Sequence, residues 1–181
     1  MKTVSVGLLT LAVGFVWVFG AHGGAKNAET KVTLKRVHMC CGGCAKEVAT
    51  ILQKVAGVKE VTCDQKANTA QFTARNATVA QNALDALAAN GFHGETGSTN
   101  YAFKNDSGVH AGKVTSLTLT SFHNSCPGCV RSFREVIKNV DGVTGDNLKS
   151  KLSTCTIAGN FDAVTLVEAL NKGGFHVHVK N

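Results

Sequence analysis

Residues 38–44 read His-Met-Cys-Cys-Gly-Gly-Cys, and residues 123–129 read His-Asn-Ser-Cys-Pro-Gly-Cys. The two stretches lie 85 positions apart, and each places a Cys-x-x-Cys pair directly before an amphipathic segment. The similarity continues toward the N-terminus, because residues 32–34 (Val-Thr-Leu) align with residues 117–119 (Leu-Thr-Leu) at the same spacing. An internal repeat of this kind indicates two copies of one structural unit.

The hydrophobic period changes in the same order within each copy. Alternating residues 32–37 predict a strand, and an apolar stripe at helical spacing then predicts a helix that Gly57 ends as a C-cap. The stripe consists of Ala45, Val48, Leu52 and Val55 in the first copy and of Val130, Phe133, Ile137 and Val140 in the second. A hairpin, a second helix and a short closing strand at Phe92 follow, and the second copy ends in the same way with Gly142 as its helix cap and a strand at Phe175. This order predicts an α+β fold of two ferredoxin-like βαββαβ domains, each an antiparallel sheet with two helices on one face.

The chain divides into four predicted segments. Residues 1–25 combine Lys2, an apolar run and small residues, which is typical of a signal peptide or, if uncleaved, of a membrane anchor. The two repeats give one domain at residues 30–97 and a second, with a divergent motif, at residues 114–181. Residues 98–113 are polar and lack an apolar period, so they are predicted to be the linker. We expect an exported protein, periplasmic or otherwise extracytoplasmic.

The charge pattern argues against nucleic acid as a partner. The net charge of +7 comes from scattered lysines and arginines, and aromatic residues make up only 6% of the chain. A nucleic-acid arm needs a block of like charges, and a base-stacking surface needs more aromatic rings. We therefore expect no nucleic-acid binding, and membrane association only through a retained leader.

Seven cysteines are an odd number, so an exported chain cannot pair all of them internally. Four of them form two pairs, Cys41 with Cys44 and Cys126 with Cys129. Sulfur atoms three positions apart at a helix start can turn to one side, and the positive helix N-terminus favours the thiolate form. Thiolates select soft ions such as copper(I), zinc, cadmium or mercury. With two protein ligands only, such an ion could pass to a partner that adds its own thiolates.

Residues 39–44, Met-Cys-Cys-Gly-Gly-Cys, fit the Met-x-Cys-x-x-Cys signature of heavy-metal-associated domains. The chain resembles that module, found in copper chaperones, in the tails of soft-metal P-type ATPases and in the periplasmic mercury-binding protein, over residues 30–96 and 114–180. The resemblance implies that Met39 is a buried support for the loop. It implies four metal ligands: Cys41, Cys44, Cys126 and Cys129. It favours copper(I), with mercury(II), zinc(II) or cadmium(II) as alternatives, and a metal-transporting membrane ATPase or another donor or acceptor protein as partner.

The second copy departs from the signature. Asn124 replaces the methionine, and Pro127 stands inside the cysteine pair. Proline can preset the first helical turn, whereas loss of the methionine support is expected to loosen the loop and weaken the site. The alternative is a degenerate copy that is kept for packing or dimer formation.

Three residues beside the motifs have open roles. Cys40 adds a third sulfur to the first loop, but adjacent side chains tend to point apart, so an additional ligand, a spare thiol and a bridge between chains are all considered. His38 and His123 share a repeat position just before the loops. They are candidates for supporting the loop or its ligands, or for pH-sensitive contacts, and the alternative is a half-exposed histidine at a strand end.

Five other cysteines and histidines are not expected to bind metal. Two cysteines fall at inward-facing strand positions, where cysteine behaves as a small hydrophobic residue. Three histidines fall in or near the closing strands. These residues are Cys63, Cys155, His93, His176 and His178.

The leading functional hypothesis is an exported, non-catalytic soft-metal-binding protein, a metallochaperone or scavenger that passes its ion by thiolate exchange. The alternative is a thiol–disulfide oxidoreductase, because Cys126 and Cys129 enclose Pro-Gly as redox motifs do. The order of elements argues against that alternative, as does the absence of any proline besides Pro127 that could stand opposite the pair. A third hypothesis is an assembly module whose cysteine pairs stay oxidised.

Overall fold

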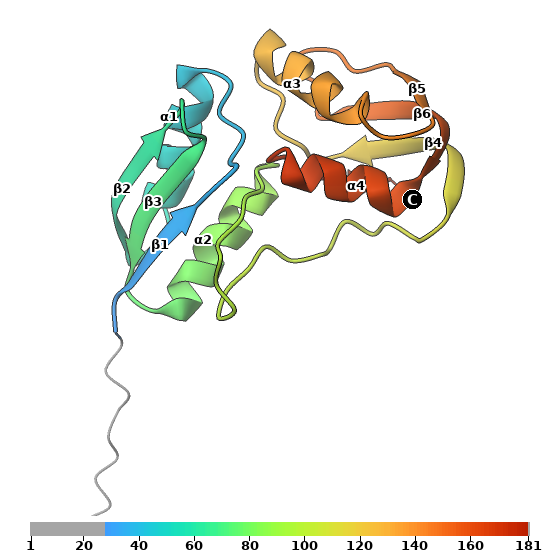
Figure 1. Ribbon diagram of the computed structural model, residues 1–181. Helices are drawn as coiled ribbons and strands as arrows, with labels where there is room; N and C mark the ends of the chain where they lie inside the picture. The colour runs from blue at the N-terminus through green and yellow to red at the C-terminus, as the bar shows by residue number, and fades with distance from the viewer. Residues whose placement is uncertain (1–27, 181) are drawn as a thin grey trace, which may run out of the picture.

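The structure, a computed structural model, describes residues 28–180, which form two α+β halves side by side (Figure 1). The first half has an antiparallel sheet of order β1-β3-β2, and the second has an antiparallel sheet of order β5-β6-β4-β7. The predicted α+β class with antiparallel sheets is confirmed. The predicted leader at residues 1–25 lies outside the described residues. Within the described part, no helix has the length and apolar character to cross a membrane.

Each half places two helices against its sheet. The elements of the first half are β1 (Thr30–Leu34), α1 (Gly42–Gln53), β2 (Val58–Asp64), β3 (Thr69–Ala74) and α2 (Ala77–Ala89). Those of the second are β4 (Lys113–Thr120), α3 (Pro127–Ile137), β5 (Val143–Asp146), β6 (Thr154–Asp162), α4 (Ala163–Lys172) and β7 (His178–Val179). Val48 and Leu52 of the predicted apolar stripe are fully buried in the first core, and Phe133 and Ile137 are buried in the second. The stripes therefore face the sheets, as helical spacing requires.

Helix ends follow local chemistry. Asn76 caps α2 by accepting a hydrogen bond from the Val79 backbone N–H at 2.9 Å. The predicted glycine caps of α1 and α3 are wrong, because the caps are Lys54 and Lys138. The glycines lie a few residues later, in turns that lead to the next strand, where the backbone takes a positive φ that glycine adopts without strain.

The predicted positions of the closing strands are also wrong. Phe92 and Phe175 do not extend their own sheets but form an antiparallel bridge with each other across the two halves. Both rings are fully buried. The fourth strand of the second sheet, β7, begins later at His178 and pairs with β4, while in the first half a single bridge joins Lys35 to Glu95. Pattern-based prediction assigned both phenylalanines to intradomain strands because it detects apolar positions without their partners.

The two halves meet where α2 and α4 end (Figure 1). Gly91 and Gly174, which follow these helices, permit the close approach. A Cβ atom on Gly91 would lie 2.1 Å from the backbone nitrogen of His123, and one on Gly174 would lie 2.5 Å from the backbone nitrogen of His38. Each glycine thus lets its backbone approach the cysteine loop of the other half. The two loops are held in place across the junction by backbone contact.

The connecting segment, residues 98–113, packs against both halves. Tyr101 is buried in the first core, and Val109 packs against the second. Lys104 forms a salt bridge of 2.7 Å with Asp85 on α2. The segment is therefore part of the folded body.

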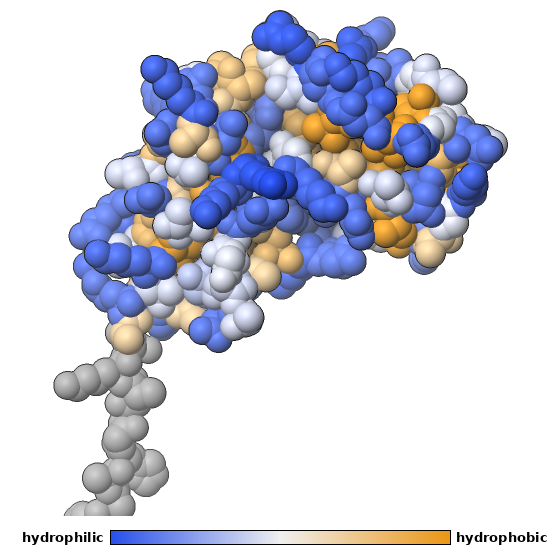
Figure 2. Space-filling model, viewed as in Figure 1, coloured by the Kyte–Doolittle hydropathy of each residue, from blue (hydrophilic) through white to orange (hydrophobic). Residues whose placement is uncertain are grey.

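Hydrophilic side chains cover most of the face seen in Figure 2. Among the described residues, the large apolar side chain most open to solvent is that of Leu152. The scattered positive charge predicted from the sequence thus forms a solvated surface.

Candidate metal centre

The two Cys-x-x-Cys loops face each other, and five sulfur atoms gather between them. Within each loop the paired sulfurs are close, at 3.4 Å for Cys41 and Cys44 and 3.6 Å for Cys126 and Cys129. Between loops, Cys41 lies 3.9 Å from Cys126 and Cys44 lies 3.8 Å from Cys129. The structure therefore brings together in one place the two pairs that the sequence treated as separate sites.

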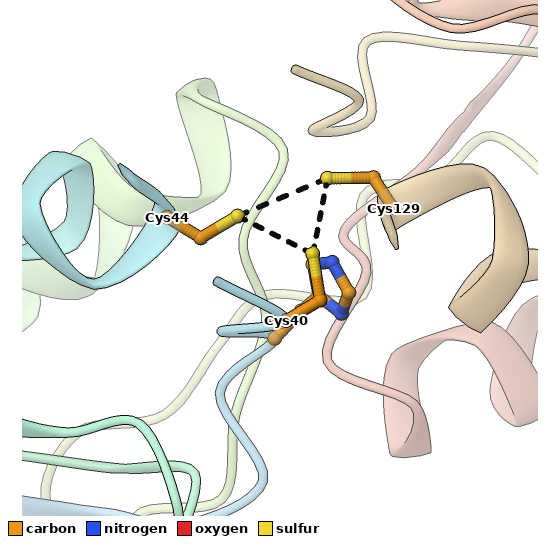
Figure 3. Close-up of side chains that lie close together, drawn as sticks. Cys40, Cys44 and Cys129 are labelled. Carbon is orange, nitrogen blue, oxygen red and sulfur yellow. Dashed lines mark hydrogen bonds between the residues drawn. The ribbon is translucent and has the colours of Figure 1, made fainter. Parts of the chain in front are cut away.

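Cys40 lies at the middle of this cluster. Its Sγ is 3.6 Å from that of Cys44, 3.5 Å from that of Cys126 and 3.6 Å from that of Cys129. Figure 3 shows Cys40, Cys44 and Cys129 pointing toward one another from the two halves. The sequence placed Cys40 beside the first pair only, but its nearest sulfur partners include two from the other half of the chain. We call Cys40, Cys41, Cys44, Cys126 and Cys129 the thiol centre.

The sulfur spacing suits metal ligation. All cysteines of the chain are free thiols, and separations of 3.4 to 3.9 Å exceed a disulfide bond of about 2.05 Å. Four sulfurs around an ion at roughly 2.3 Å, as in tetrahedral zinc sites, would lie about 3.8 Å apart. The observed distances agree with that value, so the thiol centre has the dimensions of a thiolate metal site.

Both helices of the motif direct their N-termini at the centre. Cys41 and Cys126 are the N-cap residues of α1 and α3, with nearly equal backbone angles of φ −154° and ψ 167°, and φ −148° and ψ 166°. The positive ends of two helix dipoles therefore converge on the sulfurs and favour the thiolate form. At Cys41 the nearby backbone N–H of Cys44 holds the pKa of the thiol below its ordinary value.

The thiols differ in their proton affinity. At Cys129 burial opposes ionisation, but hydrogen bonds from His123 and His38 outweigh it and lower the pKa of this thiol to about 3. Burial raises the pKa of Cys44 to about 12, and burial also raises the pKa of Cys40. Cys129 is thus ready as a thiolate and Cys41 loses its proton more easily than an ordinary thiol, whereas Cys40 and Cys44 must release protons when they bind a cation.

His38 and His123 are buried, at 6% and 5% exposure, and not half exposed as the alternative expectation held. His38 stacks on Phe175 with ring centroids 4.2 Å apart, and His123 stacks on Phe92 at 4.1 Å. Each motif histidine is therefore held by the other half's bridging phenylalanine. His38 is also close enough to Cys40, Cys44 and Cys129 to complete a four-ligand group, with all ligand atoms within 4.8 Å of one another.

Two residues missed by sequence reasoning complete the surroundings of His123. Its Nε2 lies 3.1 Å from the Ser125 hydroxyl, and its Nδ1 lies 3.6 Å from the Glu47 carboxylate on α1. The Ser125 oxygen contacts Cys44 at 4.0 Å and Cys129 at 3.9 Å, which are two of the three sulfurs that Cys40 contacts. The repeat alignment contained this signal, because Ser125 stands 85 positions after Cys40.

The loops have different internal supports. Met39 is buried in the first core, where the resemblance implied a support for the loop. At the equivalent position Asn124 donates two hydrogen bonds, of 2.8 Å to the Lys149 carbonyl and 2.7 Å to the Leu152 carbonyl. The second loop is therefore held by hydrogen bonds in place of methionine packing.

Comparison with known proteins gives a family for the first half. The profile of the heavy-metal-associated domain matches residues 33–89, so this segment is a heavy-metal-associated domain. The solution structure of the N-terminal soluble domains of Bacillus subtilis CopA is 17% identical, with coverage of 84% of this chain and 95% of that one and a TM-score of 0.31. The water-soluble region of the P-type ATPase CopA from Bacillus subtilis is 16% identical, with coverages of 84% and 92% and a TM-score of 0.27. No curated protein matches the chain.

Proposed function

Starting from the heavy-metal-associated domain at residues 33–89, we propose that this chain is a non-catalytic soft-metal-binding protein, a metallochaperone or scavenger. It holds its ion between its two halves by the thiol centre. The observation that carries this proposal is the convergence of five sulfur atoms from both loops at 3.4 to 3.9 Å. Copper(I) is the preferred ion, and mercury(II), zinc(II) and cadmium(II) are the alternatives that thiolates also select.

The second half is, in this proposal, a second heavy-metal-associated domain. Support comes from the repeat of the sequence and from the matching N-cap geometry of Cys41 and Cys126. Cys126 and Cys129 act as ligands together with the first loop and do not form a weaker site of their own.

The centre has more sulfur ligands than one soft ion uses. Two four-residue groups overlap, one of Cys40, Cys41, Cys44 and Cys126, the other of His38, Cys40, Cys44 and Cys129. Cys40 and Cys44 belong to both groups. The protein therefore binds about two ions per chain, with these two thiolates as bridges.

Transfer begins at the partly exposed sulfurs. Cys41 and Cys126 are half-buried, whereas Cys44 and Cys129 are buried. An acceptor's thiolates displace the two accessible ligands first, and separation of the halves then releases the rest. The partner is a metal-transporting membrane ATPase or another donor or acceptor protein. Residues 1–25 direct the chain out of the cytoplasm, to the periplasm or another extracytoplasmic site, and membrane attachment requires a retained leader.

Copper(I) titration of the reduced full chain against a competing chelator tests the proposal. Cys41→Ser and Cys126→Ser should each lower the affinity at least about tenfold, because each removes a ligand from one loop. Cys63→Ser is the matched control, since Cys63 is half-buried and lies outside the thiol centre. Unchanged binding in Cys41→Ser would refute metal binding by this motif, and unchanged binding in Cys126→Ser alone would refute a shared centre.

One observation favours the alternative, a thiol–disulfide oxidoreductase. The pKa of Cys129 is lowered to about 3 by its histidine neighbours against the effect of burial, and redox motifs also use such stabilised thiolates. The side chain of Cys129, however, is buried against the sulfurs of three other cysteines, so a disulfide substrate has poor access. Sustained turnover in an insulin-reduction assay would support the enzyme, whereas no turnover together with tight copper(I) binding supports the metal protein.

A further inference from the structure

A second group of ligand-type side chains lies apart from the thiol centre. Asp106 of the connecting segment, His176 after α4 and His178 of β7 have ligand atoms within 4.8 Å of one another. The Nε2 atom of His176 lies 3.0 Å from Oδ1 of Asp106, and the rings of His176 and His178 have centroids 5.2 Å apart. These residues come from segments 70 positions apart in the chain, and sequence reasoning assigned none of them to metal.

The burial of His176 points to a ligand. Its side chain is 2% exposed, and its Nε2 atom, which faces Asp106, forms no hydrogen bond among residues 28–180. A buried polar atom without a partner costs about 1–3 kcal/mol, so such atoms in folded proteins call for an explanation. A cation bound between His176 and Asp106 would give this buried ring nitrogen a partner.

The donor set selects a different class of ion from that of the thiol centre. Two imidazoles and one carboxylate offer nitrogen and oxygen donors, which suit borderline divalent ions such as zinc(II), cobalt(II) or nickel(II). Three protein ligands leave a position for water, and Asp106, with 47% of its side chain exposed, leaves an entry path from solvent. We propose that Asp106, His176 and His178 form a second metal site, for a borderline divalent cation.

The position of this site gives it a structural effect. The Val179 backbone N–H donates to the Ser107 carbonyl at 2.7 Å, so the connecting segment already pairs beside β7. The His176 backbone N–H donates across the junction to the Gly91 carbonyl at 3.0 Å. An ion on Asp106 and His176 therefore fastens the connecting segment to the backbone that joins the two halves, and stabilises the junction that closes the thiol centre.

Cobalt(II) titration of the full chain tests the site after the thiols have been filled with mercury(II). We expect about one equivalent of cobalt(II) with visible ligand-field bands and without the near-ultraviolet band of sulfur-to-cobalt charge transfer. Asp106→Asn and His178→Gln should each weaken this binding at least about tenfold. His110→Gln is the matched control, because His110 is an exposed histidine of the same segment outside the group, and it should bind as the wild type does.

The outcomes separate the ideas. Equal cobalt(II) affinity in all three variants, or a spectrum dominated by sulfur charge transfer, would overturn the second site and leave the thiol centre untouched. Conversely, loss of copper(I) binding at the thiols says nothing against this site. Circular dichroism checks that the variants fold. On the wild type, zinc(II) should shift the imidazole resonances of His176 and His178 but not those of His110, and unshifted resonances would refute the site without any substitution.

Discussion

Replacing Gly91 by alanine should open the thiol centre without altering a cysteine. Gly91 has φ +76°, and a Cβ there would lie 2.1 Å from the His123 nitrogen and 2.4 Å from the carbonyl carbon of Phe122. These are backbone atoms, so no side-chain rotation relieves the overlap. The two halves must therefore move apart where the first closing segment meets the second cysteine loop.

The expected size of the effect follows from the hydrogen bonds that this movement breaks. Among the described residues, three backbone hydrogen bonds cross the junction, from His93 to Gly174 at 2.9 Å and from His176 and His123 to Gly91 at 3.0 and 3.2 Å. At about 1 kcal/mol each, breaking them removes about 3 kcal/mol of docking free energy, which lowers the ratio of closed to open molecules about a hundredfold. The left-handed backbone adds roughly 1–2 kcal/mol of strain for alanine.

Gly97→Ala is the matched control. Gly97 has φ +63°, but a Cβ there would meet nothing within 4 Å, so this variant carries the backbone strain without the overlap. Copper(I) affinity and a scattering profile of the reduced chain should change in Gly91→Ala and remain as in the wild type in Gly97→Ala. If both variants keep wild-type affinity and compactness, the junction does not close the metal centre and the reasoning fails.

Three further variants test single contacts. Cys40→Ser should lower the copper(I) stoichiometry, whereas Ser125→Cys should raise or keep it, because the new sulfur lies beside Cys44 and Cys129 as that of Cys40 does. Equal stoichiometry in the two variants would contradict bridging by Cys40. Asn124→Ala should lower the free energy of unfolding by about 1–3 kcal/mol because two hydrogen bonds are removed, measured by urea denaturation, and an unchanged midpoint would contradict that support. Burial raises the pKa of the Asp146 carboxyl, but the ion pair with Arg134 outweighs burial and holds this pKa below its ordinary value. The pair therefore contributes stability above about pH 4, and this stability is lost as the pH falls through the lowered pKa. Because Arg134 is half exposed, Asp146→Asn should cost only about 1 kcal/mol at neutral pH and still less in acid; a cost that grows toward low pH would contradict the assignment.

Two features of the protein could be predicted from the sequence alone, the fold class and the geometry within each cysteine loop. The helical stripe through Val48 and Leu52 and the strand alternation predicted the α+β class, because burial of one face imposes a period on neighbouring residues. The Cys-x-x-Cys pairs predicted sulfurs turned to one side at a helix start, and within each loop the structure has that geometry. Both depend on residues close together in the chain.

The sequence-based predictions failed for residues whose contact partners lie in the other half of the chain. Phe92 was assigned to a strand of its own sheet, and its role in the bridge to Phe175 depends on an approach that only Gly91 and Gly174 permit. Cys40 was judged against its neighbour in sequence, although two of its three sulfur contacts come from the second loop. Local spacing contains no information on such contacts.

The sequence by itself therefore determined the fold class, the repeat and two soft thiol pairs, because periodicity, capping and motif spacing act over a few residues. Only the tertiary structure decided that the pairs and Cys40 form one centre, and that Asp106 meets His176 and His178 elsewhere. The physical reason is that docking of the two halves depends on backbone approach and ring stacking between segments distant in sequence. These contacts exist only once both halves are folded.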